Sequence, residues 1–82
     1  LIKKKINLKN INVLCQEKEL EDKIFVKVRS TGKFLKANVN IFNNYAEVNL
    51  LDPEYGISPG QACVFYSIEN GNKVLGGGWI SK

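Results

Sequence analysis

The chain has 82 residues, of which 44% are hydrophobic, and a formal net charge of +4. This length suits one domain and leaves too little apolar material for a second core. The absence of histidine excludes histidine bases, histidine metal ligands and the common catalytic triads. Because the apolar runs are far shorter than the roughly 18 residues of a membrane helix, we expect a soluble protein without membrane contact.

The first elements in chain order are the least distinct. Residues 2–8 and 11–14 are weak strand candidates. The acidic segment 15–22 shows no two-residue alternation, which indicates a solvated connection or a single helical turn. The chain contains no methionine, so we expect it to be a piece cut from a longer protein.

Period-two alternation is clearest in the middle of the chain, at 24–29 and 35–41. In the first of these strands the aliphatic residues Ile24, Val26 and Val28 share one face. Its other face carries Phe25, Lys27 and Arg29. Residues 30–33 form a turn signal between the two strands, so the sequence predicts a hairpin.

Three further strands follow, each bounded by turn residues. Asn43 and Asn44 tolerate left-handed backbone and predict a turn before a strand at 45–51, in which Ala46, Val48 and Leu50 point inward. The segment 58–61 has Pro and Gly where a type II turn needs them. Residues 61–69 and 73–80 are joined by a tight-turn sequence at 70–72. The sequence therefore predicts an all-β fold, a small antiparallel β-barrel of about six strands.

Few residues of this chain suit catalysis. Cys15 and Cys63 lack C-x-x-C spacing, and Cys63 lies in an apolar run, so we interpret it as a buried core residue, although a disulfide between them stays formally open. The glycines at 76–78 lack the lysine of a phosphate loop and indicate a bulge or a close backbone approach. Asp52 and Glu54 have no accompanying base. We therefore expect no catalytic, cofactor-binding or metal-binding residue in these 82 residues.

The predicted hairpin is the best candidate for a binding surface. Three basic residues share its outer face, and a fourth lies at its tip: Lys27, Arg29, Lys36 and Lys33. By parity Phe25, Phe34 and Phe42 lie on the same face, as aromatic rings do in single-stranded nucleic-acid platforms. Three interpretations stay open from the residues alone: RNA contact, packing of the phenylalanines on other domains, and a plain charged surface.

A family resemblance adds to this reading. The segment DPEYGISPGQACVFY at 52–66, followed by VLGGGWI at 74–80, resembles tRNA-specific 2-thiouridylases, which carry [ST]-P-G-Q-x-x-V-F-Y and L-G-G-G near the C-terminus. Residues 26–29 are similar to the family's Lys-x-Arg strand, and 11–14 to its Asn-Trp-Leu segment. The chain departs from the family at Ser30 and Thr31, where Tyr and a second Arg are usual, and at Val13, where Trp is usual.

The resemblance implies that residues 1–82 are a single C-terminal β-barrel domain similar to elongation-factor barrels, with the catalytic and central domains outside this chain. The parent would be a cytoplasmic transferase that activates the wobble uridine of tRNA with ATP and Mg²⁺ and inserts sulfur from a cysteine persulfide. Its sulfur would come from a sulfur carrier or a cysteine desulfurase. The barrel itself would not be an enzyme.

The role that the resemblance gives this domain is to bind and position tRNA beside the catalytic domain of the same polypeptide. Two alternatives stay open. The barrel would be a purely structural domain that packs on the catalytic part, or it would belong to a translation factor, since Pro-Gly-Gln turns also occur in such barrels.

Overall fold

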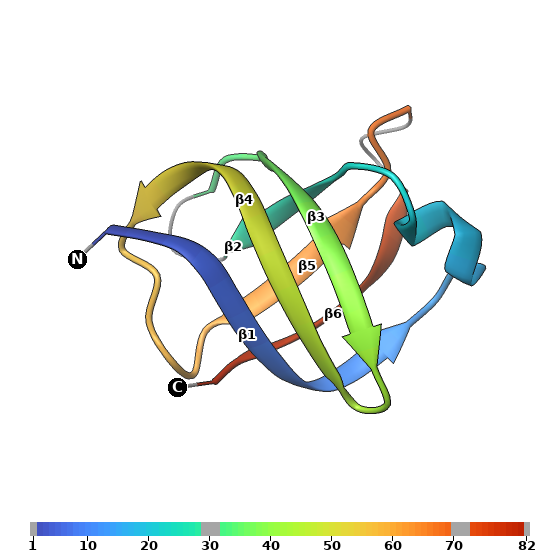
Figure 1. Cartoon of the computed structure of the whole chain (residues 1–82), viewed down its shortest axis with the longest axis horizontal. Helices are drawn as coiled ribbons and strands as arrows, with labels where there is room; N and C mark the ends of the chain where they lie inside the picture. The colour runs from blue at the N-terminus through green and yellow to red at the C-terminus, as the bar shows by residue number, and fades with distance from the viewer. Residues whose placement is uncertain (1, 29–31, 70–72, 82) are drawn as a thin grey trace.

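The computed structural model describes residues 2–28, 32–69 and 73–81. Six strands form a closed antiparallel barrel (Figure 1). They are β1 (Ile2–Val13), β2 (Ile24–Val28), β3 (Leu35–Phe42), β4 (Tyr45–Tyr55), β5 (Ala62–Tyr66) and β6 (Val74–Ile80). The prediction of an all-β barrel of about six strands is confirmed.

The strands follow the order β1-β4-β3-β2-β5-β6 around the barrel, and β6 closes it by pairing with β1. The predicted hairpin is present as the β2–β3 pair, with Ile24 opposite Ala37 and Phe25 opposite Lys36. Asn43, with a φ of 56°, forms the next turn between β3 and β4, as expected from its tolerance of left-handed backbone.

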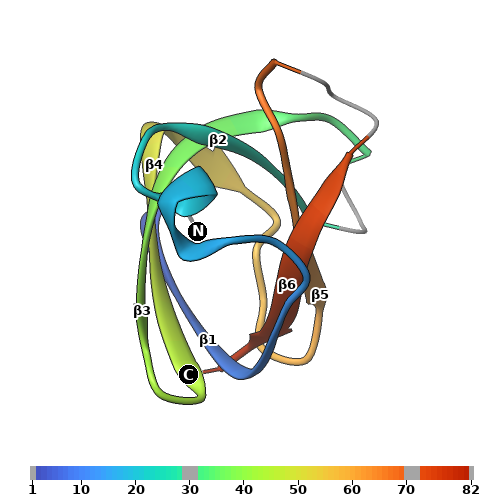
Figure 2. The ribbon, with the colours of Figure 1, turned by 90° about the vertical axis from the view of Figure 1, so that its right-hand side faces the viewer.

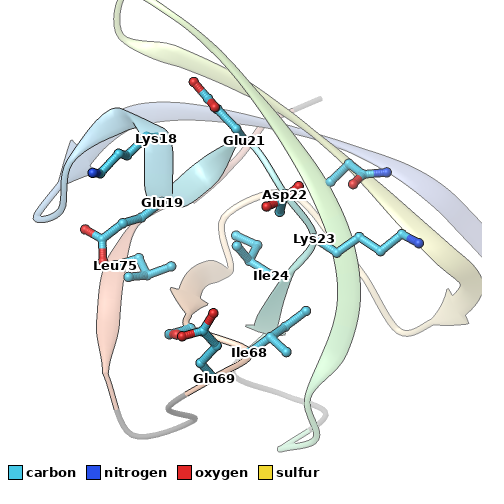
Figure 3. A pocket seen from close by; sticks show the side chains of 11 residues that line it. Lys18, Glu19, Glu21, Asp22, Lys23, Ile24, Ile68, Glu69 and Leu75 are labelled. Carbon is cyan, nitrogen blue, oxygen red and sulfur yellow. The ribbon is translucent and has the colours of Figure 1, made fainter.

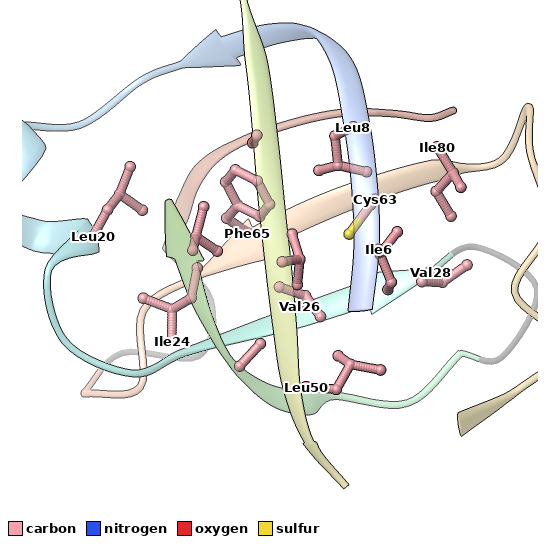
Figure 4. Close-up of a cluster of buried hydrophobic side chains, with 14 of the residues drawn as sticks. Ile6, Leu8, Leu20, Ile24, Val26, Val28, Leu50, Cys63, Phe65 and Ile80 are labelled. Carbon is pink, nitrogen blue, oxygen red and sulfur yellow. The ribbon is translucent and has the colours of Figure 1, made fainter. Parts of the chain in front are cut away.

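Alternate residues of each strand fill the barrel (Figure 4). This follows from the two-residue period of a strand, which sends successive side chains to opposite faces. The largest fully buried side chains are Phe65, Ile6, Leu8, Ile24, Leu50, Leu75, Ile80, Val26, Val28, Val48 and Cys63. The inward faces predicted for 24–28 and 45–50 are therefore correct.

The N-terminal strand differs from the expectation of two separate weak strands. Residues 2–13 form one long strand whose first part pairs with β4 and whose last part pairs with β6. The pairing with β6 shifts between Lys9 and Asn12, and Asn10 between them has a φ of 54°. Because Asn adopts this conformation at little cost, the strand bends there and continues instead of ending.

A single turn of 3-10 helix, η1 (Glu17–Leu20), connects β1 to β2 and lies at one end of the barrel (Figure 2). Leu20 is only 5% exposed and belongs to the core cluster. The acidic segment 15–22 is thus a connection with one helical turn, in agreement with the sequence. Across the described part of the chain, no helix has the length and apolar character needed to span a membrane.

Candidate nucleic-acid interface

The outer face of the β2–β3 hairpin carries three of the residues that the sequence indicated, Phe25, Lys27 and Lys36. Phe25 and Lys27 alternate with the buried residues of β2 and so point away from the core. Lys36 on β3 is exposed and lies opposite Phe25 in the register. Because cross-strand neighbours are about 5 Å apart at Cβ, a ring and an ammonium group share this part of the surface.

Three aromatic rings meet on this face. The ring of Phe34, just before β3, lies with its centroid 5.4 Å from that of Phe25, at an interplanar angle of 44°. It also meets Tyr66 edge-on, with centroids 5.1 Å apart and an angle of 85°. The Nζ of Lys27 is 4.7 Å from the centroid of Phe34. This distance allows a cation–π contact, which holds the charge beside the rings.

We call the group formed by Phe25, Phe34, Tyr66, Lys27 and Lys36 the aromatic patch. Phe34 is 44% exposed, so a planar ring from a partner has access to it. Among the described residues, Lys27 and Lys36 form no ion pair with an acid. Proteins bind single-stranded nucleic acids through exposed rings interleaved with cations. The bases stack on the rings, and the phosphates pair with the charges.

The other two predicted basic residues lie differently. Lys33 forms an ion pair with Glu54, with Nζ 2.9 Å from Oε2. The hydrogen bond from Lys33 and a second one from the backbone N–H of Tyr55 hold the pKa of the Glu54 carboxyl below its ordinary value. The charge of Lys33 is therefore partly offset by an acid. Arg29 falls outside the described residues.

Sequence reasoning missed one member of the patch, and one aromatic residue that it placed on the same face lies outside the patch. Tyr66 belongs to β5, which joins the hairpin because β2 pairs with it and places Phe25 opposite Tyr66. Tyr66 lies next to the buried Phe65 and so on the outer face of β5, but the sequence of this segment does not say which strand it pairs with. Phe42 is on the expected face and 55% exposed, yet it lies at the far end of β3, opposite Tyr45.

A depression lies at the end of the barrel beside η1 (Figure 3). Its volume is about 810 Å³, and its lining contains four acids and two lysines: Glu19, Glu21, Asp22, Glu69, Lys18 and Lys23. Glu19 Oε1 is 2.7 Å from Nζ of Lys73, and this hydrogen bond lowers the pKa of Glu19 and raises that of Lys73. The excess of acids makes this end of the barrel unfavourable for phosphates.

The two cysteines are both free thiols, so they form no disulfide. Cys63 is 0% exposed, and burial raises the pKa of its thiol to about 12. Burial also raises the pKa of Cys15, with a further increase from the nearby Glu19 carboxylate. Since the thiolate is the nucleophile, Cys63 is an unreactive core residue, as the sequence indicated.

The glycines at 76–78 lie within β6 and pack against neighbouring backbone. A Cβ placed on Gly77 would lie 2.6 Å from the carbonyl oxygen of Cys63 and 3.2 Å from the Cα of Val64. Only a residue without a side chain allows β6 to approach β5 so closely. The interpretation as a close backbone approach is confirmed.

Comparison with known proteins adds an independent finding. Residues 3–80 match the family described as the aminomethyltransferase beta-barrel domain. The chain is 48% identical over 84 residues to the tRNA-specific 2-thiouridylase MnmA of Paracoccus denitrificans, an alignment that covers 99% of this chain and 21% of the relative. It is 40% identical over 80 residues to the protein of the same name from Nitratiruptor sp., with 98% and 22% covered.

A third relative of that name, from Ruegeria pomeroyi, is 57% identical over 56 residues, which cover 67% of this chain and 15% of the relative. The chain therefore spans only about a fifth of the length of these relatives.

Proposed function

Since the chain belongs to the aminomethyltransferase beta-barrel domain family and its relatives are named tRNA-specific 2-thiouridylases, we propose that it is the barrel that binds and positions tRNA in such an enzyme. The observation that carries this proposal is the aromatic patch, in which Lys27 lies 4.7 Å from the ring centroid of Phe34. Phe25 and Tyr66 support that ring on two sides. Bases would stack on Phe34 while Lys27 and Lys36 pair with phosphates.

The catalytic chemistry belongs to the remainder of the enzyme in this proposal. The longer polypeptide would act in the cytoplasm, activate the wobble uridine with ATP and Mg²⁺, and insert sulfur supplied as a persulfide by a carrier or a desulfurase. The barrel attracts the tRNA and orients it for the catalytic part. Its affinity for tRNA alone would lie near the nonspecific range, with a Kd of about 10⁻⁴ to 10⁻⁶ M, because two lysines and a few rings attract RNA but read little sequence.

The test is a tRNA titration of the 82-residue chain carrying Lys27→Glu together with Lys36→Glu. Each reversal removes a phosphate contact and adds repulsion, so binding should weaken by roughly tenfold or more at about 0.1 M salt. The matched control is Lys18→Glu, which changes the charge equally at an exposed position on η1. That variant should bind within about twofold of the original chain.

Two outcomes would contradict the proposal. An equal loss of affinity in the hairpin and control variants would mean diffuse attraction to a basic protein, and the patch would not be the contact. No measurable binding by the unaltered chain, together with loss of folding of the longer enzyme in Phe34→Ala, would mean that the patch packs on another domain.

A further inference from the structure

A second exposed surface on the barrel wall has no part in the function proposed above. It is a groove of about 270 Å³ over β6. Its floor is the backbone of residues 76–78, and Val64, Leu14, Val74 and Trp79 rise around it. We call this the glycine groove. Leu14 follows the end of β1 and is fixed beside β6 by its N–H, which donates to the carbonyl of Leu75 at 2.9 Å.

The groove is open because its floor has no side chains. The three glycines line the hollow, and none of them can be replaced by a residue with a side chain without a clash, because an added Cβ would lie within 3 Å of a neighbouring strand. The surrounding apolar side chains are exposed: Leu14 by 64%, Trp79 by 49% and Val74 by 42%. Exposed apolar side chains that gather around one hollow, unlike ones scattered singly, are typical of interaction sites.

The chemistry of the groove favours a protein over RNA. None of the described residues that line it carries a charge, and the polar ones are two asparagines, Asn10 and Asn12. RNA binding depends on cations, whereas the centres of protein interfaces are depleted in charge and enriched in Trp. Lysines lie only at the margin of the groove, where the register places Lys9 opposite Trp79 and Lys27 opposite Val64.

The manner of docking is also restricted. β6 is paired with β1 on one side and with β5 on the other, so its edge groups are already used in the barrel. A partner segment therefore has no free strand edge to extend. It has to bind through side chains that enter the hollow beside Trp79, as an anchoring residue enters a pocket at an interface centre.

We propose that the glycine groove seats apolar side chains from a segment of the same longer polypeptide outside the barrel. This rests on the proposed function in one respect, that the barrel belongs to a longer enzyme. The alignments cover 99% of this chain but 21% of its Paracoccus relative, so about four fifths of such a protein lies outside the barrel and is available to cover the groove. The groove fixes the barrel to that part and leaves the aromatic patch free for tRNA.

The experiment is hydroxyl-radical labelling of the longer polypeptide without tRNA, read at single residues by mass spectrometry. Trp79, 49% exposed in the barrel, should be oxidised about fivefold more slowly than that exposure implies, because an interface centre excludes water. Tyr55, which is 66% exposed on β4, serves as an internal reference and should keep its reactivity.

A matched pair of variants sharpens the result. Leu14→Asp places an unpaired carboxylate in the apolar contact and should restore the oxidation of Trp79 by about fivefold. Phe42→Asp introduces the same charge at a position 55% exposed on β3 and should leave Trp79 protected. If Leu14→Asp does not fold, the labelling of the unaltered polypeptide still shows whether Trp79 is covered.

Each other outcome overturns the proposal. Full reactivity of Trp79 in the unaltered polypeptide would mean that nothing covers the groove. Protection that depends on protein concentration would mean that a second copy covers the groove. Protection only in the presence of tRNA would mean that RNA covers it. Failure of the tRNA proposal is separate, because loss of tRNA binding in the Lys27→Glu and Lys36→Glu variant leaves the protection of Trp79 unchanged.

Discussion

The aromatic patch and the glycine groove are two exposed apolar surfaces on one barrel wall, and they meet at β5. Tyr66 on this strand belongs to the patch, and Val64, two residues earlier, lines the groove. The patch is interleaved with lysines, whereas no described residue of the groove is charged. Both surfaces have exposed rings, so the rings do not tell an RNA-binding surface from a protein-binding one. The cations between the rings indicate which of the two partners binds.

The two surfaces also differ in what they are made of. The patch consists of side chains on the outside of the barrel, whereas the groove is lined by three glycines at which an added Cβ would lie within 3 Å of a neighbouring strand. The patch can therefore be altered without disturbing the barrel, while the groove cannot be filled from below without moving β6. Four predictions test this contrast.

The largest effect is expected from Gly77→Ala. The new Cβ would lie 2.6 Å from the backbone oxygen of Cys63, so β5 and β6 would have to separate, and the free energy of unfolding should fall by about 3 kcal/mol. The free energy of unfolding is measured by urea denaturation, with circular dichroism as the signal. The comparison variant is Gly56→Ala, where the added Cβ meets nothing within 4 Å and the φ of 77° costs about 1 to 2 kcal/mol. A smaller loss in Gly77→Ala than in Gly56→Ala would show that the groove floor is adaptable.

The next effect concerns the patch. Phe34→Ala removes the ring that Lys27 and two other rings contact, and the affinity for tRNA should fall by about 1 to 3 kcal/mol, the range of one base–ring stack. Phe42→Ala removes a similarly exposed ring at the other end of β3 and should leave the affinity unchanged. Fluorescence anisotropy with labelled tRNA measures both. Equal losses would mean that exposed phenylalanines act without regard to neighbouring lysines, and the distinction between the surfaces would be lost.

The third prediction uses Cys63, which pairs with Gly78 in the register and lies behind the groove. Burial raises the pKa of its thiol from 9.0 to about 12, so the folded state holds the proton more tightly than the unfolded chain does. The resulting stability is complete below pH 9 and is lost as the pH rises toward 12, by about 1.4 kcal/mol per pH unit.

The measurement is the free energy of unfolding of the unaltered chain and of Cys63→Ala under reducing conditions at several alkaline pH values. The difference between the two should change by about 1.4 kcal/mol per unit above pH 9. A constant difference would mean that water reaches the thiol through the groove, and that the floor is less tightly closed than the glycine contacts indicate.

The smallest effect compares two lysines of the hairpin. Lys36→Gln removes a cation without an acidic partner among the described residues, and should reduce the log–log salt slope of tRNA binding by about 0.7 to 0.9. Lys33→Gln should reduce it less, because Glu54 lies 2.9 Å from Lys33 and already offsets its charge. The slopes come from titrations at several salt concentrations. The reverse order would show that Lys33 exchanges Glu54 for a phosphate.

The sequence by itself determined the all-β class, the inward faces of β2, β3 and β4, the turn at Asn43 and the burial of Cys63. These depend on local causes: the two-residue period of a strand, the backbone tolerance of Asn, and the apolar neighbours of a thiol. The family resemblance rested likewise on contiguous segments, and it was confirmed by the family match over residues 3–80 together with relatives that are named tRNA-specific 2-thiouridylases.

Only the tertiary structure decided which strands pair, because pairing depends on how the whole sheet closes and not on any one segment. In the closed barrel Tyr66 lies opposite Phe25, and Phe42 lies at the far end of β3, opposite Tyr45. Lys33 forms an ion pair with Glu54 of β4. Closure also brought Leu14 and Trp79 to one hollow lined by three glycines. Residues far apart in the chain meet there because a barrel joins its first strand to its last, and short-range patterns carry no record of that contact.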